Sequence, residues 1–412
     1  MAKLQNVRGT YDLYGEAKRK TKQVTRIAEQ VVEKYGFEEI ETPIFEFTEV
    51  FARNLGDTSD IVTKEMYCFE DRGGESLTLR PEGTAGVVRA FVSDGMQQNL
   101  PLKLYYQGPM FRYERPQKGR QRQFTQFGVE LFGAATPQAD VELIAMAYEF
   151  LEKLGLQGQV VVEINSLGDA ESRDAYREKL VAYLRQNYDK LSEDSKNRLE
   201  RNPLRVLDSK EECDKEVVEN APLYADSWNE FSKDFFTKVL HGLDVLGIKY
   251  RVNNRLVRGL DYYSHTVFEL VTDKLGAQGT VLAGGRYDGL IEQMGGGPVS
   301  GIGWACGVER LAMLLEQADT AQRPIVVVPV CDDVDEQAIK IAQNIRMAGF
   351  RAEQGYSGNM KKRMMKADKM MAKAVVIVGP DELAKGEVVV KKLDDGQQKS
   401  VAIDKLVEEL GK

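Results

Sequence analysis

Strand-like segments recur through most of this chain, and they lie beside helical segments without alternating with them in strict order. Short strands linked by hairpin-like turns pair antiparallel, whereas strictly alternating strands and helices build parallel sheets. The pattern therefore predicts a large antiparallel sheet of the α+β class. The segments are LTLRPEG (77–83), PLKLYYQGPMFRYE (101–114), QFTQFGVELFG (123–133), VVVEINSLG (160–168), TVFELVT (266–272), GTVLAGGRYDGL (279–290) and VSGIGWACGVERL (299–311).

The chain is long enough to require more than one core. With 412 residues, two or three domains are expected. An amphipathic helix is predicted from about Lys18 to Tyr35, and Gly36 ends it. The highly charged, helix-favouring stretch 169–242 predicts a helical subdomain inserted into a first domain of residues 1–320.

The pattern changes after Gln322–Pro324, which has the composition of a linker. From there on, strands and helices alternate, which is typical of a small α/β domain with a mostly parallel sheet. We therefore predict a second domain over residues 325–412. Its expected elements are the strand PIVVVPV (324–330), the helix DEQAIKIAQNIRMAG (335–349), the strands KAVVIVG (373–379) and EVVVKKL (387–393), and the helix IDKLVEEL (403–410).

Composition excludes several classes of protein. No apolar run is long enough to span a membrane, and the amino-terminal stretch lacks the apolar region of a secretory signal. The four cysteines stand apart without CxxC pairs, which argues against a structural zinc site or disulfides and favours a reducing cytoplasm. With only His241 and His265 available, a histidine base or a histidine-ligated metal is not expected.

The charge is unevenly distributed along the chain. The whole chain carries a net charge of −8, whereas Lys and Arg exceed Asp and Glu by two over residues 321–412. Local basic patches are therefore more informative than the total charge about whether the protein binds nucleic acid.

The densest cluster of positive charge lies in FRYERPQKGRQRQFTQFGVELFG (111–133), whose strand-like flanks predict a hairpin with a basic loop. Guanidinium groups present parallel donors that suit phosphates and carboxylates, although a solvated basic hairpin explains this stretch equally well on its own. Gln126 and Glu130 are an even number of residues apart on the returning strand, so they share one face of the sheet. The basic residues are Arg112, Arg115, Lys118, Arg120 and Arg122.

Three further stretches favour a structural interpretation when each is taken alone. RPEGT (80–84) is explained by a turn into a helix with Thr84 as the cap. GGRYDGL (284–290) is explained by a glycine-rich turn, and GIGWACGVERL (301–311) by close helix–sheet packing, with Glu309 and Arg310 opening the helix.

Taken together, these stretches resemble a known family. ETPIF (41–45), the basic hairpin and GVER (307–310) are similar to the three signature motifs of class II aminoacyl-tRNA synthetases, and RGLDYY (258–263) with AGGRYDGL (283–290) resembles the histidyl-tRNA synthetases. The resemblance covers almost the whole chain. It extends to RPEGT (80–84), FGVELFG (127–133), NPLRVLD (202–208) and the stretch that follows Lys361. Thr125 departs from the pattern, since many family members carry histidine there.

The resemblance implies an activity and an organisation. The fold would be a class II synthetase core with a helical insertion, followed by an anticodon-binding α/β domain. The activity would be ATP-dependent formation of histidyl-adenylate and transfer of the histidyl group to tRNA(His), in the cytoplasm. Magnesium would arrive with ATP, and no structural metal is implied. The segment around Pro43 would join two chains into a homodimer.

The resemblance also implies a role for each site residue. Arg112 would bind the α-phosphate of ATP, Arg310 the γ-phosphate, and Arg258 both the α-phosphate and the carboxylate of histidine. The remaining nucleotide-binding residues would be Glu114, Arg120 and Phe124.

The histidine ligand is neutral at its imidazole and presents one donor and one acceptor. By the resemblance, Glu130 and Tyr263 would meet these two ring nitrogens. Glu82, Thr84 and Gln126 would bind the α-amino group, and Tyr262 and Tyr287 would close the pocket. The residues implied for tRNA are Lys118, Arg122, Lys361, Lys362 and Arg363, although a charged run of the last kind is more often a solvated face.

Three alternatives remain. One is the catalytically silent paralogue that regulates ATP phosphoribosyltransferase, which generally lacks the C-terminal domain. The second is a synthetase for another amino acid, and Glu130 with the two tyrosines of RGLDYY argues against it. The third is a tRNA-binding accessory protein, which would have no reason to retain Arg112, Arg258 and Arg310 together.

Overall fold

The computed structural model describes residues 3–55, 61–209, 211–258, 262–319 and 322–411. The chain divides into two compact units, Met1–Asp319 and Thr320–Lys412. Each unit has its own sheet and its own hydrophobic core.

The first unit is built on one large sheet, and among the described residues this sheet has eight strands. The interior pairings are all antiparallel, which confirms the predicted architecture, whereas the two edge strands β1 and β8 pair in parallel and make the sheet mixed. In sheet order the strands are β1 (Glu38–Glu39), β5 (Leu102–Phe111), β6 (Gln123–Phe132), β11 (Gly301–Gly307), β10 (Thr280–Arg286), β9 (Ser264–Val271), β7 (Val161–Ser166) and β8 (Tyr250–Val252).

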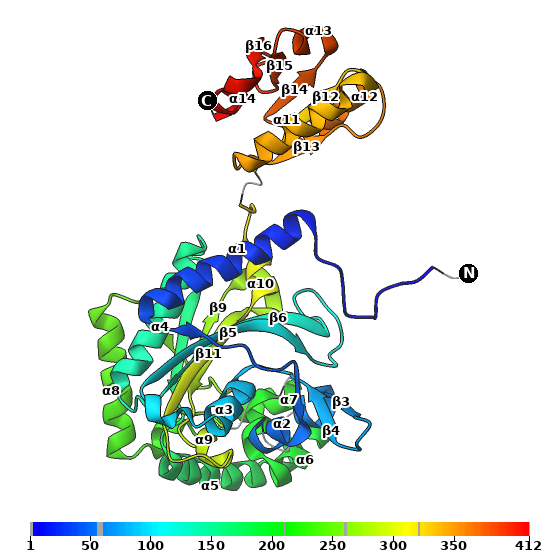
Figure 1. Ribbon diagram of the computed structural model, residues 1–412. Helices are drawn as coiled ribbons and strands as arrows, with labels where there is room; N and C mark the ends of the chain where they lie inside the picture. Colours follow the sequence, from blue (N-terminus) through cyan, green and yellow to red (C-terminus); the bar gives the residue numbers. More distant parts are fainter. Residues whose placement is uncertain (1–2, 56–60, 210, 259–261, 320–321, 412) are drawn as a thin grey trace. The chain divides into compact units, whose positions relative to one another are not determined.

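One face of this sheet is covered by helices and forms the main core (Figure 1). Alternate residues of β6, Phe127, Val129 and Leu131, point into that core, so the residues between them point to the opposite face. The predicted helix over residues 18–35 forms as an α-helix that a single 3₁₀ turn, Glu33–Tyr35, extends to Gly36. The covering helices are α1 (Gly15–Val32), α4 (Pro137–Lys153), α8 (Glu230–Val245) and α10 (Val308–Leu314).

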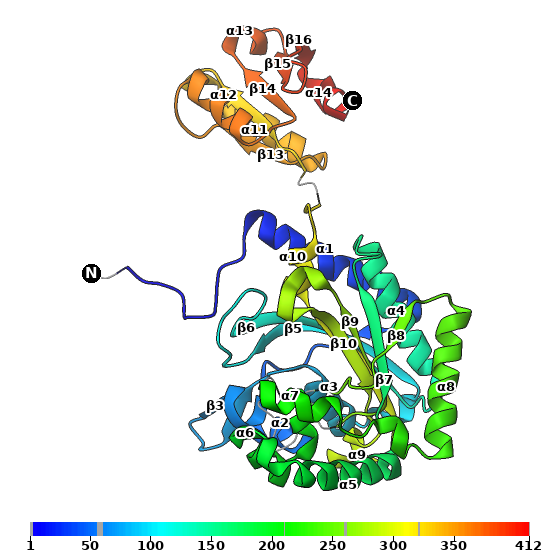
Figure 2. The ribbon, with the colours of Figure 1, turned by 180° about the vertical axis from the view of Figure 1, so that it is seen from behind.

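The opposite face is covered only in part, by α3 (Thr84–Ser93), α9 (Leu290–Gln293) and the charged stretch that follows β7 (Figure 2). This stretch is helical as predicted, with α5 (Ala170–Gln186), α6 (Glu193–Arg201) and α7 (Glu212–Glu219) before α8. These helices contribute to a second core with α3 and the tyrosines that follow Arg258. The part of this face that stays open holds the cavity described below.

The two ends of the inserted helices are tied together by reciprocal caps. Asp169 caps α5 through the Ser172 amide at 2.9 Å, and Asn229 caps α8 through the Ser232 amide at 2.9 Å. Each serine hydroxyl in turn accepts the backbone N–H of the opposite cap, at 3.1 Å in both cases. Four backbone N–H groups at the starts of α5 and α8, which have no partner within their own helices, therefore find hydrogen-bond acceptors in one small cluster. We call this the cap cluster.

A small sheet stands beside α3. It contains β2 (Phe45–Phe47), β4 (Ser76–Leu79) and β3 (Tyr67–Glu70), with α2 (Thr48–Leu55) following β2. Phe47 and Phe69 both pair with Leu77, and both phenylalanine rings are largely exposed.

The second unit has a five-stranded sheet with helices against it. The mostly parallel sheet predicted from the sequence is wrong in part, because two of its pairings are parallel and two antiparallel. The reason is the short link over residues 379–386, since a parallel neighbour needs a crossover of roughly a dozen residues or more. The elements are β13 (Ala352–Gln354), β12 (Ile325–Pro329), β14 (Ala374–Val378), β15 (Glu387–Lys392), β16 (Gln398–Ala402), α11 (Asp335–Met347), α12 (Met360–Lys369), α13 (Pro380–Leu383) and α14 (Leu406–Gly411).

Candidate active site

A cavity of about 350 Å³ opens on the partly covered face of the large sheet. Its wall includes β6, β10 and β11, Arg112 just after β5, and the first residues of α3 and α10. All of the residues that the sequence implied for histidine and ATP line this one cavity. They are Glu82, Thr84, Arg112, Glu114, Arg120, Phe124, Gln126, Glu130, Arg258, Tyr262, Tyr263, Tyr287 and Arg310.

The floor of the cavity follows from strand periodicity. Gln126 and Glu130 share one face of β6, as their spacing predicted, and Gly303 of β11 lies opposite Glu130. A Cβ atom on Gly303 would lie 2.0 Å from a Glu130 carboxylate oxygen. Glycine at position 303 therefore leaves room for the glutamate.

Glu82 holds the start of α3. Its carboxylate accepts the backbone N–H groups of Thr84 at 2.7 Å and Ala85 at 2.8 Å. The interpretation of Thr84 as the cap is therefore wrong, because Glu82 satisfies these amides and Thr84 is the first helical residue. Burial raises the pKa of Glu82, and its backbone hydrogen bonds oppose that rise.

Glu130 is the carboxyl group at the bottom of the cavity, with 1% of its surface exposed. The Tyr287 hydroxyl donates a hydrogen bond to it. Burial raises the pKa of Glu130 from 4.5 to about 8; hydrogen bonds from Tyr287 and Thr84 oppose the rise and the charge of Glu82 adds to it. Burial thus favours the protonated form of this carboxyl, whereas a hydrogen-bond donor bound beside it would favour the ionised form.

Three buried tyrosines form the wall beside Glu130. The ring of Tyr262 lies 4.7 Å from that of Tyr263 and 5.6 Å, edge-on, from that of Tyr287. Burial raises the pKa of all three hydroxyls, so they stay protonated and act as hydrogen-bond donors.

Arg258 reaches the cavity from the segment before β9. Its guanidinium forms an ion pair with Glu269, which also accepts the Thr280 hydroxyl at 2.7 Å, and it lies 6.0 Å from the Tyr263 ring centre. Burial lowers the pKa of Arg258, but Glu269, Tyr263 and Tyr262 together outweigh it, so the pKa is raised. Asp261, the aspartate of the RGLDYY stretch, lies outside the described residues.

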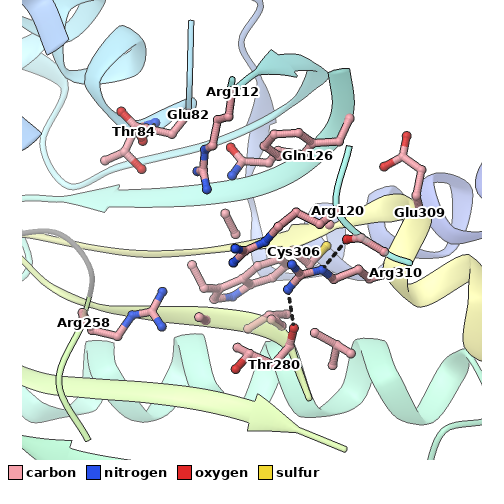
Figure 3. A pocket seen from close by; sticks show the side chains of 18 of the residues that line it. Glu82, Thr84, Arg112, Arg120, Gln126, Arg258, Thr280, Cys306, Glu309 and Arg310 are labelled. Atoms are coloured by element: carbon pink, nitrogen blue, oxygen red, sulfur yellow. Dashed lines mark hydrogen bonds between the residues drawn. The ribbon is translucent and has the colours of Figure 1, made fainter. Parts of the chain in front are cut away.

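The other end of the cavity gathers positive charge. Arg120 lies 2.6 Å from the Glu114 carboxylate, and Arg112 lies 3.9 Å from it while its guanidinium covers the Phe124 ring at 5.2 Å. Arg310 donates to the carbonyls of Gly119 and Thr280, at 2.9 Å in both cases. Figure 3 shows Arg112, Arg120, Arg258 and Arg310 directed toward one space.

The balance of charge at this end favours an anion. Burial lowers the pKa of Arg310, and the positive charges of Arg120 and Arg112 lower it further. Because neighbouring positive charges destabilise the charged form of Arg310, an anion bound nearby would stabilise it. The three guanidinium groups of Arg112, Arg120 and Arg310 outnumber the carboxylates of Glu114 and Glu309, which leaves net positive charge for phosphate oxygens.

Some residues of the cavity wall were not predicted from the sequence. Glu309 accepts the backbone N–H of Thr125 at 3.0 and 2.9 Å, and so it fixes β6 at the position that departs from the family pattern. Tyr11 reaches the wall from the amino-terminal segment, and Thr280 and Cys306 reach it from neighbouring strands. Only Glu309 carried a sequence signal, since it precedes Arg310 at the start of a predicted helix.

The residues implied for tRNA lie outside the cavity. Lys118 is exposed in the loop between β5 and β6. Arg122, on the same loop, stacks 3.8 Å from the Tyr113 ring centre and donates to the Glu114 carbonyl at 3.3 Å.

In the second unit, Lys361 and Lys362 are exposed on α12. Arg363, implied with them as a tRNA contact, is buried instead, because its guanidinium donates to the Pro329 carbonyl at the end of β12. It therefore belongs to the packing of α12 on the sheet.

The part of the chain that the structure describes has neither a cluster of metal ligands nor a membrane-spanning helix. Among the described residues, no group of three or more His, Cys, Asp or Glu side chains is arranged to hold a metal ion. No helix within the described ranges is both long and apolar enough to cross a membrane.

The large antiparallel sheet, with arginines around a cavity on one face, defines a class II aminoacyl-tRNA synthetase core. Residues 9–311 match the family described as histidyl-tRNA synthetase, and residues 324–412 match the anticodon binding domain. The chain therefore belongs to the histidyl-tRNA synthetase family, whose members activate histidine and transfer it to tRNA(His).

Individual relatives match this chain along all or nearly all of its length. The histidine–tRNA ligase of Rhodospirillum rubrum is 56% identical over 414 residues, with 100% of both chains covered. That of Gluconacetobacter diazotrophicus is 54% identical over 404 residues, covering 98% of this chain and 97% of the relative. The crystal structure of apo S. aureus histidyl-tRNA synthetase superposes with a TM-score of 0.84 at 36% identity, covering 100% of each chain.

Proposed function

We propose that the cavity binds histidine at the Glu130 end and ATP at the arginine end, with the reaction centre between them. A carboxylate oxygen of histidine attacks the α-phosphorus of ATP, a P–O bond forms to give histidyl-adenylate, and pyrophosphate leaves. Both reactants are negatively charged, so rate enhancement comes from positioning and from preorganised positive charge.

At the histidine end, the imidazole has one donor and one acceptor to satisfy. Ionised Glu130 accepts the ring N–H, and the Tyr263 hydroxyl donates to the other nitrogen. Glu82, Thr84 and Gln126 surround the α-amino group. The burial of Glu130 supports this assignment, because a buried polar site rejects side chains that lack matching groups.

At the nucleotide end, Arg112 binds the α-phosphate and Arg310 the γ-phosphate. Phe124 lies under the adenine ring, and Glu114 and Arg120 complete the nucleotide site. Arg258 bridges the histidine carboxylate and the α-phosphate, and magnesium enters with ATP as part of the substrate. The support is the convergence of four guanidinium groups on one space.

The second step delivers the histidyl group to the terminal ribose of tRNA(His). We assign Lys118 and Arg122 to the acceptor end, and Lys361 and Lys362 of the anticodon-binding unit to the tRNA. Exposure of the three lysines supports this assignment. As a translation enzyme, the protein would act in the cytoplasm.

The observation that carries the proposal is a single cavity with a buried carboxyl at one end and three arginines at the other. We expect ATP–pyrophosphate exchange to depend on histidine alone when each of the twenty amino acids is supplied in turn. Exchange with a different amino acid would show a synthetase of other specificity. No exchange at all would show a silent regulatory or tRNA-binding protein.

We also propose a homodimer that buries the small sheet around Pro43. Phe45, Phe47 and Phe69, on the two strands that flank β4, are 53%, 51% and 45% exposed there, and such a group of exposed rings is typical of an interaction surface. Sedimentation at micromolar concentration is expected to give twice the chain mass of 46.3 kDa. Phe47→Asp should shift the protein toward the monomer, whereas Phe231→Asp, at an exposed ring on α8, should not. A wild-type protein that sediments as a monomer would contradict the dimer.

A further inference from the structure

Tyr106 lies directly behind the proposed histidine site, although it is absent from the cavity wall. It belongs to β5, pairs with Gly128 of β6, and is only 4% exposed. Gly128 stands between Gln126 and Glu130 on the face that carries both of them. The tyrosine therefore sits next to two residues assigned to histidine, yet the reaction described above gives it no role.

Two glycines make room for the Tyr106 ring. A Cβ atom on Gly128 would lie 2.4 Å from the ring and its hydroxyl oxygen, and a Cβ atom on Gly83 would lie 2.1 Å from the ring. Gly83 separates Glu82 from Thr84 at the start of α3. The ring thus fills the space between the sheet residues and the helix residues that together surround the ligand.

The hydroxyl of Tyr106 is buried among polar neighbours. It has no well-formed hydrogen bond to any described residue, although Thr84 lies close enough to influence it. Burial and the charges of Glu130 and Glu82 raise the pKa of Tyr106 well above its ordinary value, so the hydroxyl keeps its proton. An unsatisfied buried hydroxyl is unfavourable, and few such groups occur without a function.

Thr84 connects this hydroxyl to the ligand site. It follows Gly83, which lies against the Tyr106 ring, and its side chain is close enough to Tyr106, Glu130 and Glu82 to affect the pKa of each. A threonine hydroxyl has a single proton, so a donor at its oxygen frees that proton for Glu130.

We propose that Tyr106 is a positioning residue for histidine recognition: its hydroxyl donates to Thr84 and thereby directs the Thr84 hydroxyl toward Glu130. This inference rests on the proposed assignment of Glu130 to the imidazole. It explains why both Gly83 and Gly128 lack side chains.

The neighbouring residue provides a matched control. Tyr105 is 5% exposed, but it points to the opposite face of the sheet, where it stacks on Phe127 at 5.5 Å. Tyr106→Phe and Tyr105→Phe each remove one tyrosine hydroxyl from the same strand. Pyrophosphate exchange gives KM for histidine, KM for ATP and kcat, and thermal unfolding gives Tm.

For Tyr106→Phe we expect KM for histidine to rise about tenfold, the effect of losing one hydrogen bond, with KM for ATP unchanged. Tyr105→Phe should leave both values unchanged. In a Thr84→Val background, Tyr106→Phe should add little, because the two hydroxyls act as one unit.

The inference is overturned if Tyr106→Phe changes KM for histidine no more than Tyr105→Phe does. It is also overturned if both KM values rise together with a lower Tm, which indicates packing alone. Glu130→Gln in the same assay distinguishes a wrong assignment of the histidine site from a wrong role for Tyr106. A normal KM for histidine in that variant overturns the site assignment itself, whereas an impaired Glu130→Gln beside a normal Tyr106→Phe overturns only the role of Tyr106.

Discussion

Glu130→Gln is expected to lose histidine activation and, at the same time, to gain stability at alkaline pH. Glutamine cannot carry the negative charge that accepts the imidazole N–H, so histidine-dependent pyrophosphate exchange should fall by roughly 10²–10³-fold. The glutamine oxygen still accepts the Tyr287 hydroxyl, so the empty site keeps its packing.

The gain in stability follows from the raised pKa. Folding raises the pKa of Glu130 from 4.5 to about 8, which means that the folded protein favours the neutral carboxyl. The resulting stabilisation is complete below pH 4.5 and is lost as the pH rises through 8. Glutamine stays neutral throughout. The Tm of the variant should therefore exceed that of the wild type by an amount that grows from pH 5 to pH 9, on the order of a few kcal/mol in unfolding free energy.

A surface carboxylate supplies the control. Glu39→Gln, at an exposed position of β1, should change neither activity nor the pH dependence of Tm. A Glu130→Gln protein with near-normal histidine activation, or with a Tm difference that does not vary with pH, would contradict the assigned role.

Arg258→Lys is the second change with a large expected effect. An ammonium group can still pair with Glu269, so the Tm should change little, but it cannot present two parallel donors to a carboxylate and a phosphate. Losing one such donor costs on the order of 10²–10³ in rate, roughly 3–4 kcal/mol. Histidine-dependent exchange should fall by that factor. Transfer from preformed adenylate should fall less, because the phosphate is then the leaving group.

Arg286 gives the contrast for this experiment. It is fully buried, and its guanidinium donates hydrogen bonds to Asp140, Asp288 and the Ala134 carbonyl. Arg286→Lys should lower the Tm, because it breaks a buried network. An Arg258→Lys protein that behaves in the same way, destabilised but fully active when folded, would mean that Arg258 serves only as the structural partner of Glu269.

Local periodicity made part of the site predictable. Gln126 and Glu130 lie on one face of β6 because strand side chains alternate, and residues 112–122 form a basic loop because proline and glycine interrupt strand-like flanks. The antiparallel interior of the large sheet follows from the same reasoning. These features depend on residues close together in the sequence.

Contacts between distant segments were not predictable in this way. The ion pair of Arg258 with Glu269 and the bond from the Thr125 amide to Glu309 depend on how strands meet, and no local pattern contains that information. Tyr105 and Tyr106 look equivalent in the sequence, yet the pleat sends one to the main core and the other to the active site. The parallel sheet expected after residue 325 was wrong in part because a short link overrides the alternation of strands and helices.

The cap cluster has a consequence for how this chain varies. Asp169 and Asn229 fix the entry and exit of the inserted helices to each other through Ser172 and Ser232, without using any residue between α5 and α8. The points at which the chain leaves and rejoins the catalytic sheet are therefore held by the caps, whatever the length of the exposed loops between the inserted helices. Between the caps, the exposed positions can therefore vary, whereas buried ones such as Leu199 and Val217 share a core with Tyr262 and Tyr263 and are constrained by the reaction centre.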